Sequence, residues 1–144
     1  MTSFSHYTQP HAFSTIEREQ YIKLTTFRKN GQGVDTPVWF AVHEGTIYIV
    51  TGAVSGKVKR IRHTPRVFLA PCTASGTVKA AAIEGKARVV TDIQESYVAK
   101  AALQRKYGIQ LTIFASIMLL VRFFKRRSTR VNSTYLAIEP LYIA

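Results

Sequence analysis

The clearest pattern along the chain is a series of short runs rich in β-branched and aromatic residues, separated by turn-forming residues. Runs of this kind predict β-strands. Six strands are expected, over Tyr21–Phe27, Val34–Val42, Thr46–Thr51, Arg66–Pro71, Ala80–Thr91 and Thr134–Ala144. Within the longest run, Glu84 and Gly85 indicate a β-bulge. The first two strands, joined by the turn residues Asn30 to Gly33, are expected to form a hairpin.

Helical signals fall between these strands. Four helices are predicted, over Ile16–Gln20, Ser55–Arg62, Asp92–Tyr107 and Leu111–Lys125. Ser14 with Glu17, and Asp92 with Glu95, have the spacing of a capping box, and Gly108 is placed to end the third helix. In the second helix, Ser55 is a candidate N-cap, and apolar residues three positions apart predict one buried face.

Many strands with few helices favour a small β-barrel over a parallel sheet, because too few helices are present to connect repeated βαβ units. A length of 144 residues, with 47% hydrophobic and 19% charged residues, is typical of one domain with one core. We expect residues 1–13 to be a flexible leader and residues 14–144 to be a single domain.

The location of the protein is predicted from its cysteine content and its apolar segments. Cys72 is the single cysteine, so no intrachain disulfide can form, and the N-terminus lacks the pattern of a signal peptide. A cytoplasmic protein is therefore expected. The apolar run from Ile113 to Val121 is shorter than the roughly 20 residues that cross a bilayer. It predicts a buried or dimer-facing helix, or else an interfacial helix whose following Lys125–Arg127 contact anionic lipid.

The net charge of +12, from 20 basic and 8 acidic residues, favours an anionic partner. Four of the cations, Lys57, Lys59, Arg60 and Arg62, follow a strand end, two glycines and Ser55. Free N–H groups at a helix start attract anions, and Lys57 and Arg60, three residues apart, can reach one phosphate. The segment therefore predicts a phosphate site, although a solvated basic helix would have the same composition.

Other chemistries have less support in the sequence. The segment is not a nucleoside triphosphate loop, because Thr51 and Val58 stand where that motif requires glycine and serine or threonine. No metal site is expected from the spacing of the histidines, and no arrangement for hydrolysis is apparent. Nucleic-acid binding would favour aromatic residues among the cations, and none occurs from Ser55 to Arg66.

Several segments together resemble one known family, the pyridoxamine-phosphate-oxidase-like split-barrel proteins, and in particular their F420-dependent branch. The segments are Thr36–Phe40, Ser55–Arg60, Pro65–Val67, Ala70–Cys72 and Glu84–Arg88. The resemblance runs from about Tyr21 to Val90 and, more weakly, to Gly108. It implies a mostly β fold, a six-stranded split barrel of the FMN-binding type, that forms a homodimer with the cofactor in a groove between subunits.

The resemblance also implies roles for individual residues. Lys57 and Arg60 would contact the cofactor phosphate, with Ser55 and Lys59 as further candidates. The ring system would be lined by Thr36, Pro37, Val38 and Trp39. Trp39 alternates with its neighbours as in any buried strand, so a position in the core is the alternative for that residue.

The function predicted from these observations is an oxidoreductase that uses FMN or F420 and acts on a small-molecule substrate. No separate catalytic motif is required, because the cofactor carries out the hydride chemistry. A non-catalytic flavin-binding or carrier protein, and a basic nucleic-acid-binding protein, are the alternatives. A homodimer is also expected from the last helix, whose apolar residues exceed what a small barrel can cover, namely Phe114, Ile117, Met118, Val121 and Phe124.

Overall fold

The computed structural model describes residues 16–110, 113, 116, 117, 120 and 133–141. These residues form seven strands: β1 (Tyr21–Phe27), β2 (Gly33–Val38), β3 (Ala41–His43), β4 (Thr46–Gly52), β5 (Arg66–Cys72), β6 (Ile83–Val89) and β7 (Ser133–Pro140). Two helices accompany them, α2 (Gly56–His63) and α3 (Ile93–Tyr107). Within the described residues, no helix is both long enough and apolar enough to cross a membrane.

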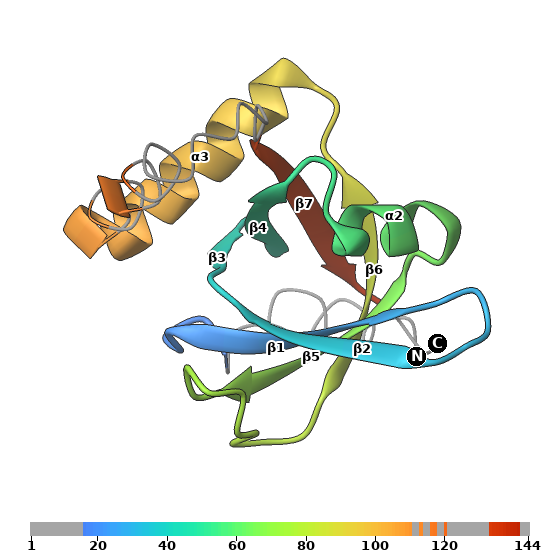
Figure 1. Cartoon of the computed structure of the whole chain (residues 1–144). Helices are drawn as coiled ribbons and strands as arrows, with labels where there is room; N and C mark the ends of the chain where they lie inside the picture. Colours follow the sequence, from blue (N-terminus) through green and yellow to red (C-terminus); the bar gives the residue numbers. More distant parts are fainter. Residues whose placement is uncertain (1–15, 111–112, 114–115, 118–119, 121–132, 142–144) are drawn as a thin grey trace, which may run out of the picture.

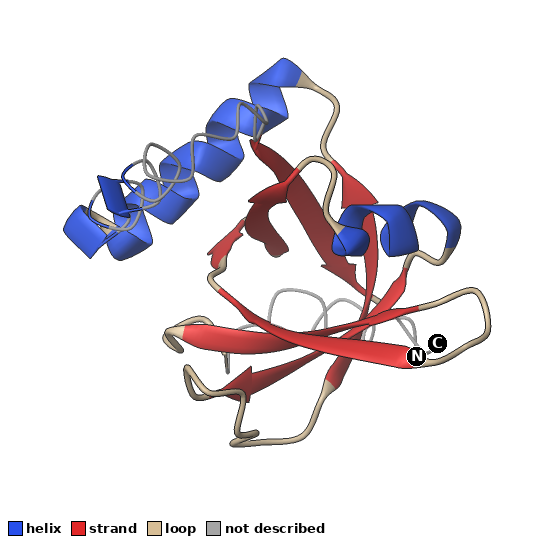
Figure 2. Cartoon of the chain, in the orientation of Figure 1, coloured by secondary structure: helices blue, strands red, loops and turns tan. Residues whose placement is uncertain are grey.

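All seven strands belong to one antiparallel sheet with the order β2-β1-β5-β6-β7-β4-β3. The two edge strands, β2 and β3, are separated in the chain only by Trp39 and Phe40. The sheet must therefore curl until its edges approach each other, as the ribbons show (Figure 1, Figure 2). This arrangement confirms the predicted mostly β, barrel-type fold.

The predicted strand Val34–Val42 is divided in two, which gives seven strands where six were expected. The division has a local cause. The backbone N–H of Phe40 donates to the hydroxyl of Tyr107 at 2.8 Å, and the same hydroxyl lies 2.8 Å from the carbonyl oxygen of Phe40. The two backbone groups of Phe40 thus bond to a helix residue instead of a neighbouring strand, and the chain turns from one sheet edge to the other.

Three further predictions on local structure were wrong. The long run Ala80–Thr91 forms only the shorter β6, and Gly85 pairs in continuous register with both neighbouring strands, without a bulge. A Cβ on Gly85 would lie 2.7 Å from the Cγ2 atom of Ile138, so close packing accounts for this glycine. The segment predicted as the helix Ile16–Gln20 is a turn, in which the N–H of Glu19 donates to the carbonyl of Ile16.

The two helices cover different parts of the sheet (Figure 1). The apolar face of α2, formed by Val58 and Ile61 as predicted, joins the main core, whose largest members include Phe40, Ile22, Leu24, Ile47, Ile49, Leu69, Leu136 and Ile138. The helix α3 instead packs on β3, β4 and β7. It ends, as predicted, at Gly108, whose φ of 51° lies in the left-handed region that glycine tolerates.

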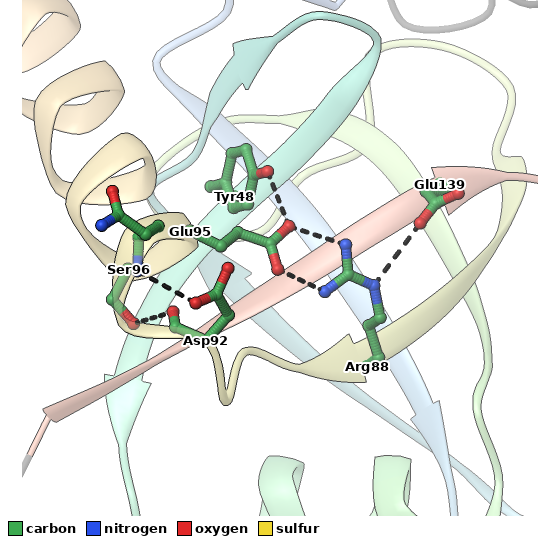
Figure 3. A network of polar contacts seen from close by, with 7 residues as sticks. Tyr48, Arg88, Asp92, Glu95, Ser96 and Glu139 are labelled. Carbon is green, nitrogen blue, oxygen red and sulfur yellow. Dashed lines mark hydrogen bonds and ion pairs between the residues drawn. The ribbon is translucent and has the colours of Figure 1, made fainter.

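A polar network fastens the first turn of α3 to the sheet (Figure 3). Arg88 on β6 donates two hydrogen bonds of 2.6 Å to Glu95, and the hydroxyl of Tyr48 on β4 donates to the same carboxylate at 2.9 Å. Glu139 lies 3.4 Å from Arg88. Hydrogen bonding from Arg88 lowers the pKa of Glu95, whereas burial and the hydrogen bond to Glu95 raise the pKa of Tyr48 to about 12.

Several predictions lie wholly or partly outside the described residues. These are the leader, residues 1–13, the capping residue Ser14, the basic segment Lys125–Arg127, the end of the strand Thr134–Ala144, and most of the helix Leu111–Lys125, including its residues Phe114, Met118, Val121 and Phe124. The described positions of that segment, residues 113, 116, 117 and 120, are helical. Ile113, Ile117 and Leu120 are each more than half exposed, at 52%, 54% and 59%, so these three apolar side chains are not buried by the described chain.

Candidate functional site

The predicted phosphate segment forms the junction between β4 and α2. Ser55 is the N-cap of α2, and its hydroxyl oxygen accepts the N–H of Val58 at 3.4 Å and lies 3.2 Å from the hydroxyl of Thr51. The first N–H groups of a helix have no partner within the helix. With Val58 capped, the N–H groups of Gly56 and Lys57 are the ones left at the start of α2 for a ligand. Ser55 itself is engaged in shaping the helix start.

Arg60 is held in place over this helix start. Its Nε atom donates to the hydroxyl of Thr26 on β1 at 2.6 Å, and Thr26 is buried. A Cβ on Gly56 would lie 2.7 Å from the Nη1 atom of Arg60, so the guanidinium group lies directly over Gly56. The glycine therefore makes room for Arg60, and the Nη atoms are brought to the N-terminus of α2.

Lys57 and Arg60 lie close enough to affect each other electrostatically. Burial first, and the charge of Arg60 second, lower the pKa of Lys57. Burial and the charge of Arg28 lower the pKa of Arg60. Arg28, which directly follows β1, is thus a third cation of this group, which we call the α2 cation cluster: Arg28, Lys57 and Arg60.

No side-chain carboxylate in the described part of the chain forms an ion pair with the α2 cation cluster. All eight acidic residues lie in the described part of the chain, and six of them pair with other bases: Glu19 with Lys79, Asp35 with Lys23, Glu44 with His43, Glu84 with Arg66, and Glu95 and Glu139 with Arg88. The described residues contain no ion pair that involves a member of the cluster. Lys57 and Arg60 are partly buried and Arg28 is exposed, and cations grouped without an acidic partner favour the binding of an anion.

The structure separates the predicted phosphate contacts into two groups. Lys57 and Arg60 share one side of α2, whereas Lys59 is exposed. With about 3.6 residues per turn, Lys59 points roughly 200° away from Lys57 around the helix. Arg62 is also exposed. The α2 cation cluster therefore includes two of the four predicted phosphate residues, Ser55 caps the same helix start, and Lys59 lies on another face.

Three of the predicted ring-contacting residues, Thr36, Pro37 and Val38, lie on β2, which among the described strands pairs only with β1 and so forms a sheet edge. Thr36 and Val38 pair with Leu24 and Ile22, which puts them on the same face of the sheet as Thr26. Pro37 is exposed and points to the opposite face. Thr36 and Val38 are thus on the inner side of the sheet, where Val38 is buried in the main core, whereas Pro37 is exposed on the outer side.

Trp39 lies beyond the end of β2, in an aromatic group with α3. Its ring stacks on Tyr107 with centroids 4.7 Å apart and an interplanar angle of 10°, and the ring of Tyr21 lies 6.5 Å away. Trp39 is partly buried and lines a cavity of about 440 Å³ together with Gln20, Tyr21, Gln110, Ile113 and Ile117. It is therefore both a packing residue and a wall of a cavity.

β2 connects the cation cluster to this cavity. Val34 pairs with Thr26, the residue that holds Arg60, and Trp39 follows five residues later. At about 3.4 Å per residue, this separation is roughly 17 Å. A phosphate site at one end of a strand and an aromatic cavity at the other suit an elongated ligand with a charged end and a flat end.

Sequence reasoning did not identify Thr26, Arg28 or Tyr107 as part of this region. For Thr26 a signal was present, because it continues the inward positions of Ile22 and Leu24 and is polar where an apolar residue is expected. Arg28 and Tyr107 carry no comparable signal, since their neighbours in the site come from distant parts of the chain.

Comparison with known proteins agrees with the fold and with the resemblance in the sequence. The sequence model of the pyridoxamine 5'-phosphate oxidase family matches residues 8–140. The chain therefore belongs to this family. No curated protein matches it.

Solved structures similar to this chain carry different names. An F420 reductase is 16% identical with a TM-score of 0.58, over 90% of this chain and 93% of its own. An FAD-binding protein from Mesorhizobium loti is 11% identical with a TM-score of 0.62, over 92% and 87%. A heme storage protein from Vibrio cholerae is 10% identical with a TM-score of 0.61, over 94% and 92%. At such identities the likeness shows a shared fold.

Proposed function

We propose that this protein is an oxidoreductase that uses a phosphorylated flavin or deazaflavin, FMN or F420, and that the start of α2 binds the cofactor phosphate. The observation that carries the proposal is the α2 cation cluster, which lies at the N-terminus of a helix and has no carboxylate partner among the residues that the structure describes. Membership of the pyridoxamine 5'-phosphate oxidase family supports a flavin-type cofactor. The similar F420 reductase supports the deazaflavin alternative.

The residues at the site fit a phosphate group by their chemistry. The N–H groups of Gly56 and Lys57 point along the helix axis toward its N-terminus, where the helix dipole favours negative charge. Lys57 supplies a point charge, and Arg60, fixed through Nε by Thr26, keeps its Nη atoms for a forked contact with phosphate oxygens. Partial burial strengthens these contacts relative to those of an exposed lysine.

The ring system is proposed to lie along β2, toward Trp39. The free edge of β2 offers backbone N–H and C=O groups to the polar edge of a flavin, and Thr36 and Val38 face the same side as the cation cluster. The bound cofactor would supply the hydride chemistry, while the protein binds and orients it. Val38 is the weakest of the predicted ring contacts, because its side chain is buried in the main core.

A homodimer is proposed to complete the groove. The cavity at Trp39 is lined on one side by Ile113 and Ile117, which are more than half exposed, and Ile109 and Leu120 extend the same apolar stripe at 75% and 59% exposure. Exposed apolar side chains at helical spacing typically mark an interface. A second copy seated on this stripe would cover it and close the cavity. Sedimentation at micromolar concentration is expected to show a dimer, and a protein that remains monomeric would contradict this part of the proposal.

The phosphate assignment is tested by three substitutions on one helix. Lys57→Ala and Arg60→Ala should each weaken FMN or F420 binding by about tenfold or more, because a hydrogen bond to a charged group contributes about 1.5–3 kcal/mol. Arg62→Ala is the matched control, since it removes an exposed charge from the same helix. Equal weakening by all three, removed by salt, would mean diffuse attraction and would overturn the assignment.

A further inference from the structure

A second positively charged group, on α3 and away from the α2 cation cluster, lacks a hydrogen-bond partner among the described residues. The Nζ atom of Lys106 is buried and has no hydrogen-bond partner among the described residues. It lies 3.4 Å from the centroid of the Phe40 ring and 5.4 Å from that of Tyr107. A cation–π contact compensates part of the charge but satisfies none of the three N–H donors of an ammonium group.

Lys106 also lines a cavity between α3 and β3. The cavity measures about 290 Å³ and is lined by Glu17, Ala41, Val42, His43, Ala102, Arg105 and Lys106. Its size is close to the lower limit of about 300 Å³ for small-molecule pockets. The alanine and valine side chains provide apolar walls, and Arg105 and Lys106 outnumber the one acid, Glu17.

The acidic residues nearby do not serve as partners of the amine. Glu19 is paired with Lys79 at 2.6 Å. Burial lowers the pKa of Lys106 to about 8, and the charges of Glu17 and Glu19 oppose this shift only in part. A buried donor without an acceptor is costly, so an acceptor brought by a ligand would have a large effect at this position.

We propose that this cavity binds a small, largely apolar carboxylate, whose oxygens accept hydrogen bonds from the Lys106 ammonium group. Lys106 lines the cavity, and binding requires its amine to turn from the Phe40 ring toward the ligand. Arg105 and Lys106 against Glu17 leave one net positive charge, which matches a monoanion better than a phosphate. The site shares no residue with the α2 cation cluster and does not depend on the proposed flavin chemistry.

Benzoate is a suitable probe, with benzyl alcohol as its uncharged analogue and inorganic phosphate as the competing anion. Titration calorimetry on the full chain should show benzoate binding at least about tenfold tighter than either of the other two. Benzyl alcohol binding as tightly as benzoate would overturn the role of the ammonium group. Phosphate binding as tightly as benzoate would overturn the assignment to a carboxylate.

Substitutions on α3 separate this site from general attraction. Lys106→Met keeps the length of the side chain and should lower benzoate affinity by about tenfold. Lys100→Met removes an exposed charge from the same helix and should leave binding unchanged. Equal effects of the two would contradict the proposal. If Lys106→Met fails to fold, Lys106→Arg is tested instead. Because arginine keeps the positive charge, this variant should still bind benzoate more tightly than benzyl alcohol. Loss of that preference would also contradict the proposal.

Proton uptake gives a readout specific to Lys106. The titratable and charged groups that face it are Glu17 and Glu19 before β1, His43 on β3 and Arg105 on α3. Because a bound carboxylate favours the charged amine, benzoate binding near pH 8 should take up a proton, which appears as a dependence of the binding heat on the buffer. Wild-type protein should show this uptake and Lys106→Met should not. Uptake that persists in Lys106→Met would assign it to another group and overturn the proposal.

Discussion

Thr26 is predicted to act on the phosphate site through Arg60 alone. Its hydroxyl lies 2.6 Å from the Nε atom of Arg60, and Thr26 does not belong to the α2 cation cluster itself. Thr26→Val keeps the shape of the side chain and removes the hydrogen-bond acceptor. The guanidinium group then loses the contact that holds it over Gly56, so its Nη atoms should spend less time at the start of α2.

The expected magnitude follows from the exposure of Arg60. A hydrogen bond to a charged group contributes about 1.5–3 kcal/mol when no water replaces it. Arg60 is partly exposed, so water can replace Thr26 in the variant. We therefore expect a loss of about 1 kcal/mol in FMN affinity, roughly fivefold. The free energy of unfolding should change little, because the added methyl group of valine is buried favourably in the core.

A double-mutant cycle tests this reasoning. FMN affinity is measured for wild type, Thr26→Val, Arg60→Ala and the double variant. If Thr26 acts through Arg60, the double variant should bind as Arg60→Ala does, with no further loss. An effect of Thr26→Val that is undiminished in the Arg60→Ala background would refute the proposed positioning role.

Three further predictions concern the stability of the fold. Tyr107→Phe removes the acceptor of the buried N–H of Phe40 and should lower the free energy of unfolding by about 1–3 kcal/mol, measured by urea unfolding through the fluorescence of Trp39, the single tryptophan; an unchanged midpoint would contradict this. Lys106→Met should raise the urea midpoint, most of all below pH 8. Folding lowers the pKa of Lys106 from 10.5 to about 8, so the charged amine destabilises the folded wild type fully below pH 8 and progressively less as the pH rises toward 10.5. A difference in midpoint between the two proteins that widens with rising pH would contradict this. Glu95→Gln should destabilise the protein at neutral pH and make its free energy of unfolding depend less on pH in the acid range. Folding lowers the pKa of Glu95, so the ionised carboxylate stabilises the protein above its pKa in the unfolded state, and this stabilisation is lost as the pH falls through its pKa in the folded state. Identical acid unfolding profiles of the two proteins would contradict this.

The elements that sequence reasoning predicted well are those whose signals are local. The strand Tyr21–Phe27 and the helix capped by Asp92 and ended by Gly108 have period, cap and terminator within the segment itself. The break at Phe40 depends on Tyr107, which lies 67 residues later in the chain, so the local pattern reads as one continuous strand. Gly85 was misread for a similar reason, because its close neighbour Ile138 belongs to a distant strand.

The candidate site divides in the same way. The helix start with Ser55, Lys57 and Arg60 is local in sequence, and the structure brings Lys57 and Arg60 together. The contributions of Thr26 and Arg28 depend on how α2 packs against β1, which no spacing along the chain reveals. The run of four cations from Lys57 to Arg62 also suggested that Lys59 could share the phosphate site, but helical geometry points Lys59 away from Lys57.

A fluorescence titration of the purified protein with FMN, riboflavin and F420 side by side tests most directly whether the start of α2 recognises a phosphate on a flavin-type cofactor. FMN and riboflavin share the ring system and differ in the phosphate. We expect FMN or F420 to bind at least about tenfold more tightly than riboflavin, because riboflavin lacks the phosphate and its charge-assisted contacts. Equal affinity for FMN and riboflavin would contradict it.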